Sequence, residues 1–147
     1  MFTTDLVLRE VASRPDFWAV ASPLIWSGTG LTVVVPTGAL TDLASIPRAL
    51  RNIPNLDPDG YSRSAAVCHD WLYRTHQLSK ADADSFLRYA IISRGGSAWS
   101  AYLFYLGVTV GGSSSYTCHP DGVVAADFDT QANYDAWRAT DAGLQGY

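Results

Sequence analysis

Four side chains in one short stretch have the types that acid–base chemistry requires. His69 is followed directly by Asp70, and Asp82 and Asp84 come soon after in the same apolar stretch. A carboxylate that orients an imidazole fixes the tautomer of the ring and raises its basicity. The ring can then take a proton from water, which is the minimal equipment of a hydrolase without a nucleophilic side chain. The alternative is structural: the same side chains could pair only to join two helices, because buried polar groups need hydrogen-bond partners whether or not they are catalytic.

Two antiparallel helices are expected to position these groups. From Ser62 on, apolar residues at helical spacing occupy two opposite faces of the predicted helix, so we expect this first helix to be buried on all sides. The face that carries His69 also holds Ala65, Ala66, Leu72, Tyr73 and His76, and the opposite face holds Val67 and Trp71. The link at Leu78-Ser79 is short, which predicts that the second helix returns antiparallel to the first.

The second helix presents Asp84 to the first one. Ser79 and Asp82 resemble a capping box with Asp in place of the usual Glu, so Asp82 is assigned to the helix start. At about 1.5 Å of rise per residue, His69 and Asp84 lie at nearly the same height along the hairpin. The spacing therefore predicts a hydrogen bond between His69 and Asp84 across the hairpin.

Asp70 is the candidate for holding a cation beside the water molecule. It is rotated by about 100° from His69 on the same helix. Carboxylate and carbonyl oxygens are the ligands that calcium prefers. His69 and His76 lie seven residues apart, roughly 10 Å along a helix, and therefore cannot share one metal ion. A divalent cation at this site is accordingly predicted to be calcium rather than zinc.

A second polar group lies upstream, in "TDLASIPRALRNIP". Ser45 is predicted to cap a short helix, which Pro54 ends. Arg48 falls in the first turn, where the helix dipole disfavours a cation, so we expect a partner for it. That partner is either Asp42 or an anionic substrate group brought to His69. A plain turn and helix cap is the alternative explanation for these residues, and Ser45 lacks the G-x-S-x-G context of a nucleophile.

The rest of the chain predicts an α+β fold. The first third contains "FWAVASPLIWSG" and "GLTVVVPTGAL", which predict a small antiparallel β-sheet with Pro23 and Pro36 at strand ends. After the helical hairpin, the apolar segment from Trp99 to Val110 predicts a buried third helix. The tail after it is polar, rich in turns and dotted with aromatic residues. We therefore expect a single α+β domain over residues 1–112 and a C-terminal extension or docking arm over residues 113–147.

Composition narrows the classes of partner. The chain has 147 residues and a net charge of −4, and no Lys/Arg cluster suggests nucleic-acid binding. The most apolar stretch has about a dozen residues, short of the roughly 20 that span a membrane. No signal-peptide pattern is visible, which predicts synthesis in the cytoplasm. Cys68 and Cys118 are expected to be free thiols rather than a disulfide.

Three ordered motifs resemble the phage-encoded domain-of-unknown-function 1353 family. They are "VPTGALTDLASIPRAL", "GYSRSAAVCHDWLYRT" and "SKADADSFLRYAI", and the resemblance extends over roughly residues 15 to 110. Positions that match its pattern include Pro36, Gly38, Thr41, Asp42, Ser45, Pro47, Arg48, His69, Asp70, Leu72, Tyr73, Ala83 and Asp84. The resemblance implies a phage or prophage origin, among tail and lysis genes. It therefore implies synthesis in the cytoplasm of a host bacterium and association with other virion or tail subunits. It supplies no activity.

A weaker similarity links the same helices to phospholipases A2, in which H-D-x-x-Y is followed by an aspartate on the antiparallel helix. By that resemblance His69 is the general base, Asp84 its orienting carboxylate, Tyr73 the support of Asp84, and Asp70 a calcium ligand. The glycine-rich calcium loop and the paired cysteines of those enzymes are absent from this sequence.

Two functional hypotheses follow. The first is a tail-associated hydrolase that acts on the bacterial envelope, either phospholipid or peptidoglycan, with His69, Asp84 and Tyr73 as its catalytic group. Asp42, Ser45 and Arg48 support that group or bind substrate. The second is a structural virion component without activity, in which the His–Asp cluster holds the helical hairpin together. A small binding protein directed against host defence also fits the size and acidity, but no motif supports it.

Overall fold

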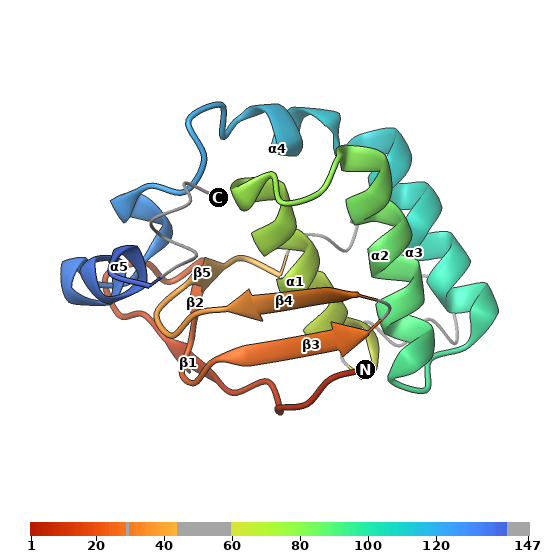
Figure 1. Ribbon diagram of the computed structural model, residues 1–147, viewed down its shortest axis with the longest axis horizontal. Helices are drawn as coiled ribbons and strands as arrows, with labels where there is room; N and C mark the ends of the chain where they lie inside the picture. The colour runs from red at the N-terminus through yellow and green to blue at the C-terminus, as the bar shows by residue number, and fades with distance from the viewer. Residues whose placement is uncertain (29, 44–59, 141–147) are drawn as a thin grey trace.

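The computed structural model describes residues 1–28, 30–43 and 60–140. Small antiparallel sheets form the N-terminal part and helices follow, so the predicted α+β class is confirmed (Figure 1). The strands are β1 (Leu8–Glu10), β2 (Trp18–Val20), β3 (Leu24–Gly28), β4 (Leu31–Val35) and β5 (Leu40–Thr41). The main helices are α1 (Ser62–Thr75), α2 (Lys80–Ser93), α3 (Ala98–Gly111) and α5 (Gln131–Arg138). The short helix predicted from Ser45 lies outside the described residues.

The described strands form two sheets where the sequence predicted one. β1, β2 and β5 make one sheet, and β3 pairs with β4 in the other. Pro23 lies between β2 and β3 and has no N–H for a ladder, so the chain turns into a second sheet there. In the β3–β4 hairpin, buried Leu24 and Trp26 pair with buried Val35 and Val33, which is the alternation expected of a sheet with one covered face.

The helical hairpin packs against that covered face. Trp26 on β3 meets Phe86 on α2 edge to face, with ring centroids 4.9 Å apart. Helix α1 is buried on nearly every side, as its sequence predicted. It ends at His76, whose left-handed conformation (φ 52°) turns the chain, and the side chain of Ser79 then caps α2 by accepting from the Asp82 amide at 3.2 Å. The predicted cap at Ser79 is confirmed, and the Ser79 hydroxyl also donates to Asp82 Oδ2 at 2.6 Å, in place of the backbone bond of a full capping box.

Helix α3 differs from its prediction. It was expected to be buried, yet only Ala101, Phe104 and Val108 are buried, all on the side that packs against α2. Large apolar side chains lie on the opposite side and are exposed. The segment's uniform hydrophobicity has no helical period, so it could not reveal that only one face is covered.

The C-terminal segment packs on the core as far as the structure describes it. It contains α4 (Ser113–Thr117), the 3₁₀ turn η2 (Ala125–Asp127) and α5. Phe128 and Trp137 are buried against Trp71 of α1, at ring-centroid distances of 6.0 and 5.7 Å. The amide of Asp129 donates to the carbonyl of Gly38 at 3.0 Å. Residues 113–140 therefore contact the core, and the predicted division at residue 112 into a domain and an extension or docking arm stays a prediction.

Two further expectations concern the whole chain. Cys68 is buried and Cys118 is exposed, and both are free thiols, as predicted. Among the helices that the structure describes, none has both the length and the apolar character needed to cross a membrane.

Candidate functional site

The predicted contact between the two helices of the hairpin is present. His69 Nε2 lies 3.1 Å from Asp84 Oδ1, and both side chains are buried. The antiparallel link between α1 and α2 brings the two residues to the same height, as the sequence indicated. The predicted contact is therefore confirmed.

Asp84 binds two further donors. The Tyr73 hydroxyl donates to Oδ1 at 2.5 Å, and the Lys80 ammonium donates to Oδ2 at 2.7 Å. Burial alone would raise the pKa of Asp84, but the hydrogen bonds from His69, Lys80 and Tyr73 outweigh it and hold the pKa at about 2. Asp84 is therefore ionised at neutral pH. Lys80 also donates to the carbonyl of Val108 on α3 at 3.2 Å, so this charge cluster joins three helices.

The ionised carboxylate determines which nitrogen of His69 carries the proton in the neutral ring. An ionised carboxylate only accepts hydrogen bonds, so the nitrogen that faces it, Nε2, must be the donor. The lone pair then resides on Nδ1. This atom is buried and has no hydrogen-bond partner among the described residues. A buried acceptor without a partner costs roughly 1–3 kcal/mol, which a bound water or substrate hydroxyl would offset.

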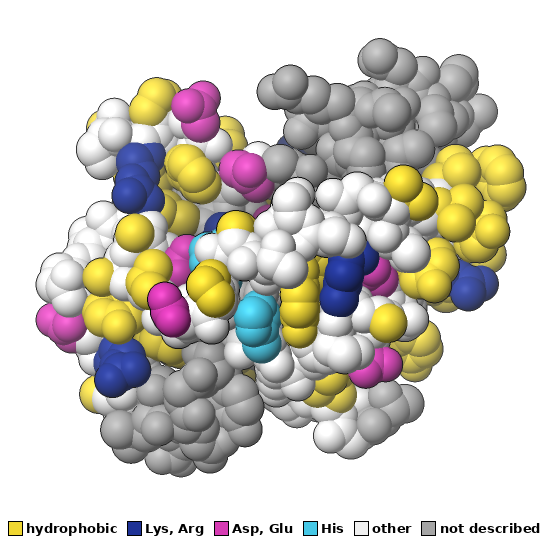
Figure 2. All heavy atoms as spheres, turned by 90° about the horizontal axis from the view of Figure 1, so that it is seen from above, with side chains coloured by type: hydrophobic (Ala, Val, Ile, Leu, Met, Phe, Trp, Pro, Cys, Tyr) yellow, Lys and Arg dark blue, Asp and Glu magenta, His cyan; other side chains and the backbone are white. Residues whose placement is uncertain are grey.

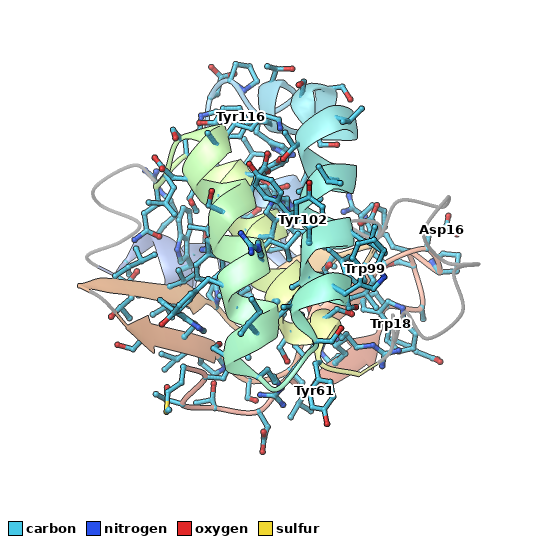
Figure 3. All side chains as sticks on the ribbon, turned by 90° about the vertical axis from the view of Figure 1, so that its right-hand side faces the viewer. Asp16, Trp18, Tyr61, Trp99, Tyr102 and Tyr116 are labelled. Carbon is cyan, nitrogen blue, oxygen red and sulfur yellow. The ribbon has the colours of Figure 1, made fainter. Side chains whose placement is uncertain are left out.

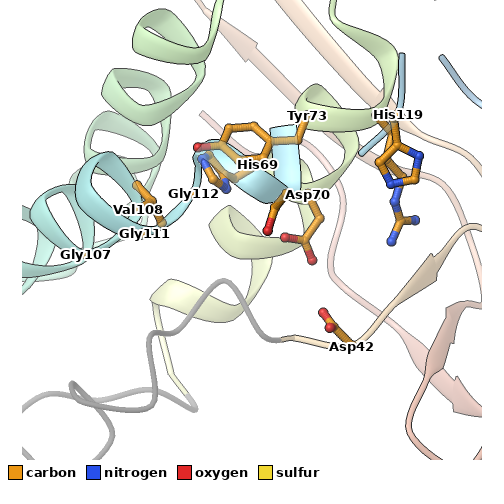
Figure 4. Close-up of a pocket in the computed structure, with 11 residues that line it drawn as sticks. Asp42, His69, Asp70, Tyr73, Gly107, Val108, Gly111, Gly112 and His119 are labelled. Carbon is orange, nitrogen blue, oxygen red and sulfur yellow. The ribbon is translucent and has the colours of Figure 1, made fainter. Parts of the chain in front are cut away.

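His69 lies in the wall of a cavity of about 310 Å³ between α1, the end of α3 and the C-terminal segment (Figure 4). The cavity is lined by Asp42, His69, Asp70, Tyr73, Arg74, Gly107, Val108, Gly111, Gly112, Ser115 and His119. Three of the predicted site residues, His69, Asp70 and Tyr73, come from two neighbouring turns of α1, with Asp42 across from Asp70. Asp84 lies behind His69 and does not line the cavity. The arrangement is an oriented imidazole at the wall of a small polar cavity.

Tyr73 donates a hydrogen bond to Asp84 and packs against the backbone of Gly112. Burial and its hydrogen bond to ionised Asp84 both raise the pKa of Tyr73, so its hydroxyl keeps its proton and acts as a fixed donor. The backbone of Gly112 passes so close that an added Cβ would lie 2.5 Å from the Tyr73 hydroxyl oxygen. Glycine at this position thus allows the α3–α4 junction to close over Tyr73.

Asp70 is half-buried at the cavity and accepts a hydrogen bond from the Thr41 hydroxyl at 2.8 Å. Burial raises the pKa of Asp70 to about 6, against the lowering effects of Arg74, His69 and Thr41, and the charge of Asp42 adds to the rise. A carboxyl group with this pKa is partly protonated near neutral pH. It can therefore donate a proton as well as hold a water molecule.

The cation predicted at Asp70 is not supported by a ligand set in the part of the chain that the structure describes. No group of three or more His, Cys, Asp or Glu side chains there is arranged to hold a metal ion. Asp42 and Asp70 both line the cavity, but among the described residues no third side chain is arranged with them to complete a metal site. Calcium binding therefore stays a prediction.

Several residues of the site were missed from the sequence. Lys80 lies four residues before Asp84, a spacing that pairs opposite charges on a helix and could have revealed it. Arg74 faces the cavity and donates to the carbonyl of Leu40, and His119 closes the far end. The amide of Gly122 donates to the carbonyl of His119 at 3.0 Å, so His119 begins a turn.

The ionic contacts of Arg74 and His119 could not be predicted from the sequence either. Asp127 lies 3.7 Å from Arg74 Nε and 3.9 Å from His119 Nδ1. Burial lowers the pKa of His119, although the charge of Asp127 acts to raise it. Asp127 lies far along the chain from Arg74, so no local spacing indicates this contact. Ser45 and Arg48, the other predicted site residues, lie outside the described residues.

Comparison with known proteins gives one family. The family model described as "Protein of unknown function (DUF1353)" matches residues 18–108. The matched region includes Asp42, His69, Asp70, Tyr73 and Asp84, and it ends before Gly111 and His119. No curated protein and no solved structure matches the chain.

Proposed function

This chain belongs to the DUF1353 family of proteins of unknown function, and we propose that it is a hydrolase in which His69 activates water. The observation that carries the proposal is the state of His69. Its Nε2 is occupied by ionised Asp84, whereas its Nδ1 is buried without a partner among the described residues, and His69 is one of the residues that line the cavity. A purely structural histidine would be expected to satisfy both of its nitrogens.

The proposed reaction uses groups already in place. Nδ1 of His69 takes a proton from a water molecule as the water oxygen attacks the electrophilic centre of the substrate. Asp84, held by Tyr73 and Lys80, stabilises the imidazolium that forms. Asp70 in its protonated form gives a proton to the leaving oxygen or nitrogen as the scissile bond breaks. The proton on His69 then returns to Asp70 or to solvent, and the site is restored.

The substrate proposed is a component of the bacterial envelope, either phospholipid or peptidoglycan, and the setting proposed is a phage tail. Support for this setting is the resemblance of "TDLASIPR" and "HDWLY" to a phage-encoded family. A cavity of about 310 Å³ is at the small end of the range for ligand sites, which suits one headgroup or one peptide unit rather than a longer segment.

A structural virion component is the second candidate, and one observation favours it. Asp84 receives three side-chain donors, and Lys80 also reaches the carbonyls of Val108 and Thr109. This is more than orientation of an imidazole needs, and it ties α1, α2 and α3 together. On this alternative the cluster stabilises the helices and the cavity has no substrate.

The deciding experiment compares wild type with His69→Gln and Tyr73→Phe. Each protein is melted with calcium, with zinc and with a chelator, and each is assayed for release from phospholipid vesicles and from purified peptidoglycan. Since Tyr73 and Lys80 still bind Asp84 in His69→Gln, its melting temperature should fall only slightly. Its activity should drop at least about 100-fold, as expected for a lost general base. Tyr73→Phe is the matched control, because it removes a donor to Asp84 and keeps the base.

The outcomes separate the two candidates. Loss of activity in His69→Gln with a near-native melting temperature, and substantial activity in Tyr73→Phe, would support the hydrolase. Wild type without activity on either substrate under any of the cation conditions, together with lowered melting temperatures in both variants, would overturn it in favour of the structural component.

A further inference from the structure

The lining of the cavity beside His69 is polar. Of the described residues that form it, Val108 is the one with a purely aliphatic side chain, and three of the others are glycines. A phospholipid in this cavity would have to place its glycerol backbone and the start of an acyl chain beside the general base. Acyl chains bind through burial of their CH₂ groups against apolar side chains. The described lining offers a phospholipid no channel of that kind.

The charged groups of the cavity disfavour a phosphate. Asp42 and Asp70 both belong to the lining, and the charge of Asp42 already acts to raise the pKa of Asp70. Arg74 lines the cavity as well, but it donates to the carbonyl of Leu40, and its Nε lies 3.7 Å from Asp127 Oδ1. Its positive charge is therefore shared with a carboxylate before a substrate binds. A phosphodiester would meet two carboxylates and one such guanidinium among the described lining residues, which is an unfavourable balance.

The outer surface near the cavity gives a bilayer little to bind. The net charge of −4 opposes contact with anionic lipid. On the face that carries α4, the Lys and Arg side chains of the described residues are scattered and do not gather in one patch (Figure 2). Trp18 and Tyr61 are exposed aromatic residues of the kind that anchor proteins among lipid headgroups, but they lie below Tyr116 in Figure 3, toward the end of the molecule where α3 begins. The cavity lies at the other end of α3, beside Gly111 and Gly112.

Given the proposed hydrolase function, we propose that the bond cleaved is a peptide amide, so that the substrate is the peptide part of peptidoglycan rather than a phospholipid. Nδ1 of His69 takes one proton of water while the water oxygen bonds to the amide carbon. The amide nitrogen leaves only after it has taken a proton, and Asp70, which lines the same cavity, gives it that proton as the C–N bond breaks. A carboxylic acid and an amine are the products, and the proton on His69 passes to Asp70 or to solvent.

A glycosidic bond, the other kind of bond in peptidoglycan, fits the lining less well. Sugar rings commonly stack on an open aromatic face, and Tyr73 is the one Tyr, Phe or Trp among the described lining residues. Its ring centroid lies 4.1 Å from that of His69 and 5.3 Å from that of Tyr116, and its hydroxyl donates to Asp84. Both its ring and its hydroxyl are therefore already engaged. The N–H and C=O groups of a peptide can instead pair with the carboxylates, the Ser115 hydroxyl and the imidazoles of the lining.

The test measures which bond is broken. Wild type is incubated with purified peptidoglycan, and new amino groups are counted separately from new reducing ends. Vesicles of phosphatidylethanolamine and phosphatidylglycerol are assayed in parallel for released fatty acid and headgroup. We expect new amino groups alone, at a rate that falls at least about 100-fold in His69→Gln. The matched control is His76→Gln, which should retain the wild-type rate, because His76 at the end of α1 is exposed and is not among the described lining residues.

A binding measurement tests the substrate class without turnover. His69→Gln is titrated by calorimetry with a soluble stem peptide of peptidoglycan and with dihexanoylphosphatidylcholine. We expect it to bind the peptide and not the lipid. Ser115→Trp, which puts a bulky side chain at the cavity, should abolish binding of the peptide. Unchanged binding in Ser115→Trp would overturn the placement of the peptide in this cavity.

The outcomes separate the bond cleaved from the hydrolase function itself. Release of fatty acid or headgroup, or the appearance of new reducing ends, would overturn the peptide amide and leave the hydrolase standing. Peptide binding without turnover of any substrate would overturn the hydrolase and support the peptide as the ligand of the cavity. Neither turnover nor peptide binding would overturn both.

Discussion

Asp84 links the stability of the helical hairpin to the state of His69. It is buried, yet the donors from His69, Tyr73 and Lys80 keep its pKa at about 2. A carboxyl with a lowered pKa stabilises the folded state above its unfolded pKa of 3.8, and this stabilisation is lost as the pH falls through about 2. The shift corresponds to a free energy of unfolding on the order of 2 kcal/mol.

Asp84→Asn therefore should destabilise the protein most at neutral pH. We expect urea unfolding at pH 7 to show a loss of about 2 kcal/mol or more, because the ionised acceptor is gone and Lys80 keeps only the carbonyls of Val108 and Thr109 as acceptors. The difference from wild type should shrink as the pH is lowered toward about 2, where wild-type Asp84 is itself protonated. Asp16→Asn, at an exposed carboxylate, is the control and should leave unfolding unchanged. An Asp84→Asn difference that is the same at both pH values would contradict this account.

Asp70 opposes Asp84 in the pH dependence of stability. Its pKa is raised to about 6, so its folded state retains the proton more strongly than the unfolded chain does. Its contribution is present below pH 3.8 and is lost as the pH rises through about 6. The comparison of Asp84→Asn with wild type cancels this contribution, because Asp70 is present in both proteins.

At the scale of elements, the junction between α3 and α4 forms one wall of the cavity. Two neighbouring glycines meet there, but their surroundings differ. A Cβ at Gly112 would lie 2.5 Å from both the Tyr73 hydroxyl oxygen and the Val108 carbonyl oxygen, whereas a Cβ at Gly111 meets nothing within 4 Å. Only Gly112 is therefore required for close packing.

Gly112→Ala should lower the free energy of unfolding by about 1–3 kcal/mol, because the junction must shift away from Tyr73. Gly111→Ala is the control. It should be neutral or stabilising by up to about 1 kcal/mol, since alanine favours the helix. Thermal and urea unfolding measure both effects. Equal destabilisation by the two replacements would contradict the close contact.

The helical hairpin was predictable from the sequence because its signals are local. The apolar repeat in α1, the short link and the Ser79 cap each depend on residues a few positions apart, and together they determine the His69–Asp84 contact. The exposure of α3 was not predictable, since its apolar residues cover every face of the helix. The wall formed by Gly112 and His119 depends on contacts with α1 and η2 that no spacing in the chain reveals.

At the scale of the whole molecule, the two ends of the chain complete one core. Trp71 lies in the middle of the sequence and is enclosed by Phe128 and Trp137 from the C-terminal segment. Ala39 forms a β-bridge with Phe128, and the Arg14 side chain donates to the carbonyl of Ala126 at 2.7 Å. We therefore expect the C-terminal segment up to Thr140 to contribute to the stability of the core.

Trp137→Ala should cost about 3–5 kcal/mol in the free energy of unfolding, which is typical of removing a buried tryptophan. Removal of residues after Gly112 should leave an unfolded or loosely packed chain. Val124→Ala, at an exposed valine of the same segment, is the control and should change stability little. These values come from urea unfolding followed by tryptophan fluorescence and circular dichroism. A truncated chain that melts cooperatively at the wild-type temperature would show instead that the segment is a separable arm.

The enclosure of Trp71 also bears on how the protein is made. Its last partners, Phe128 and Trp137, are synthesised after the sheets and the helical hairpin. A ribosome adds about 5–20 residues per second, so Trp71 and its apolar neighbours stay uncovered for several seconds on every nascent chain. During that interval the chain is open to chaperones, to proteases and to aggregation with its neighbours. Yield in the cell should consequently depend on how quickly the final stretch is translated.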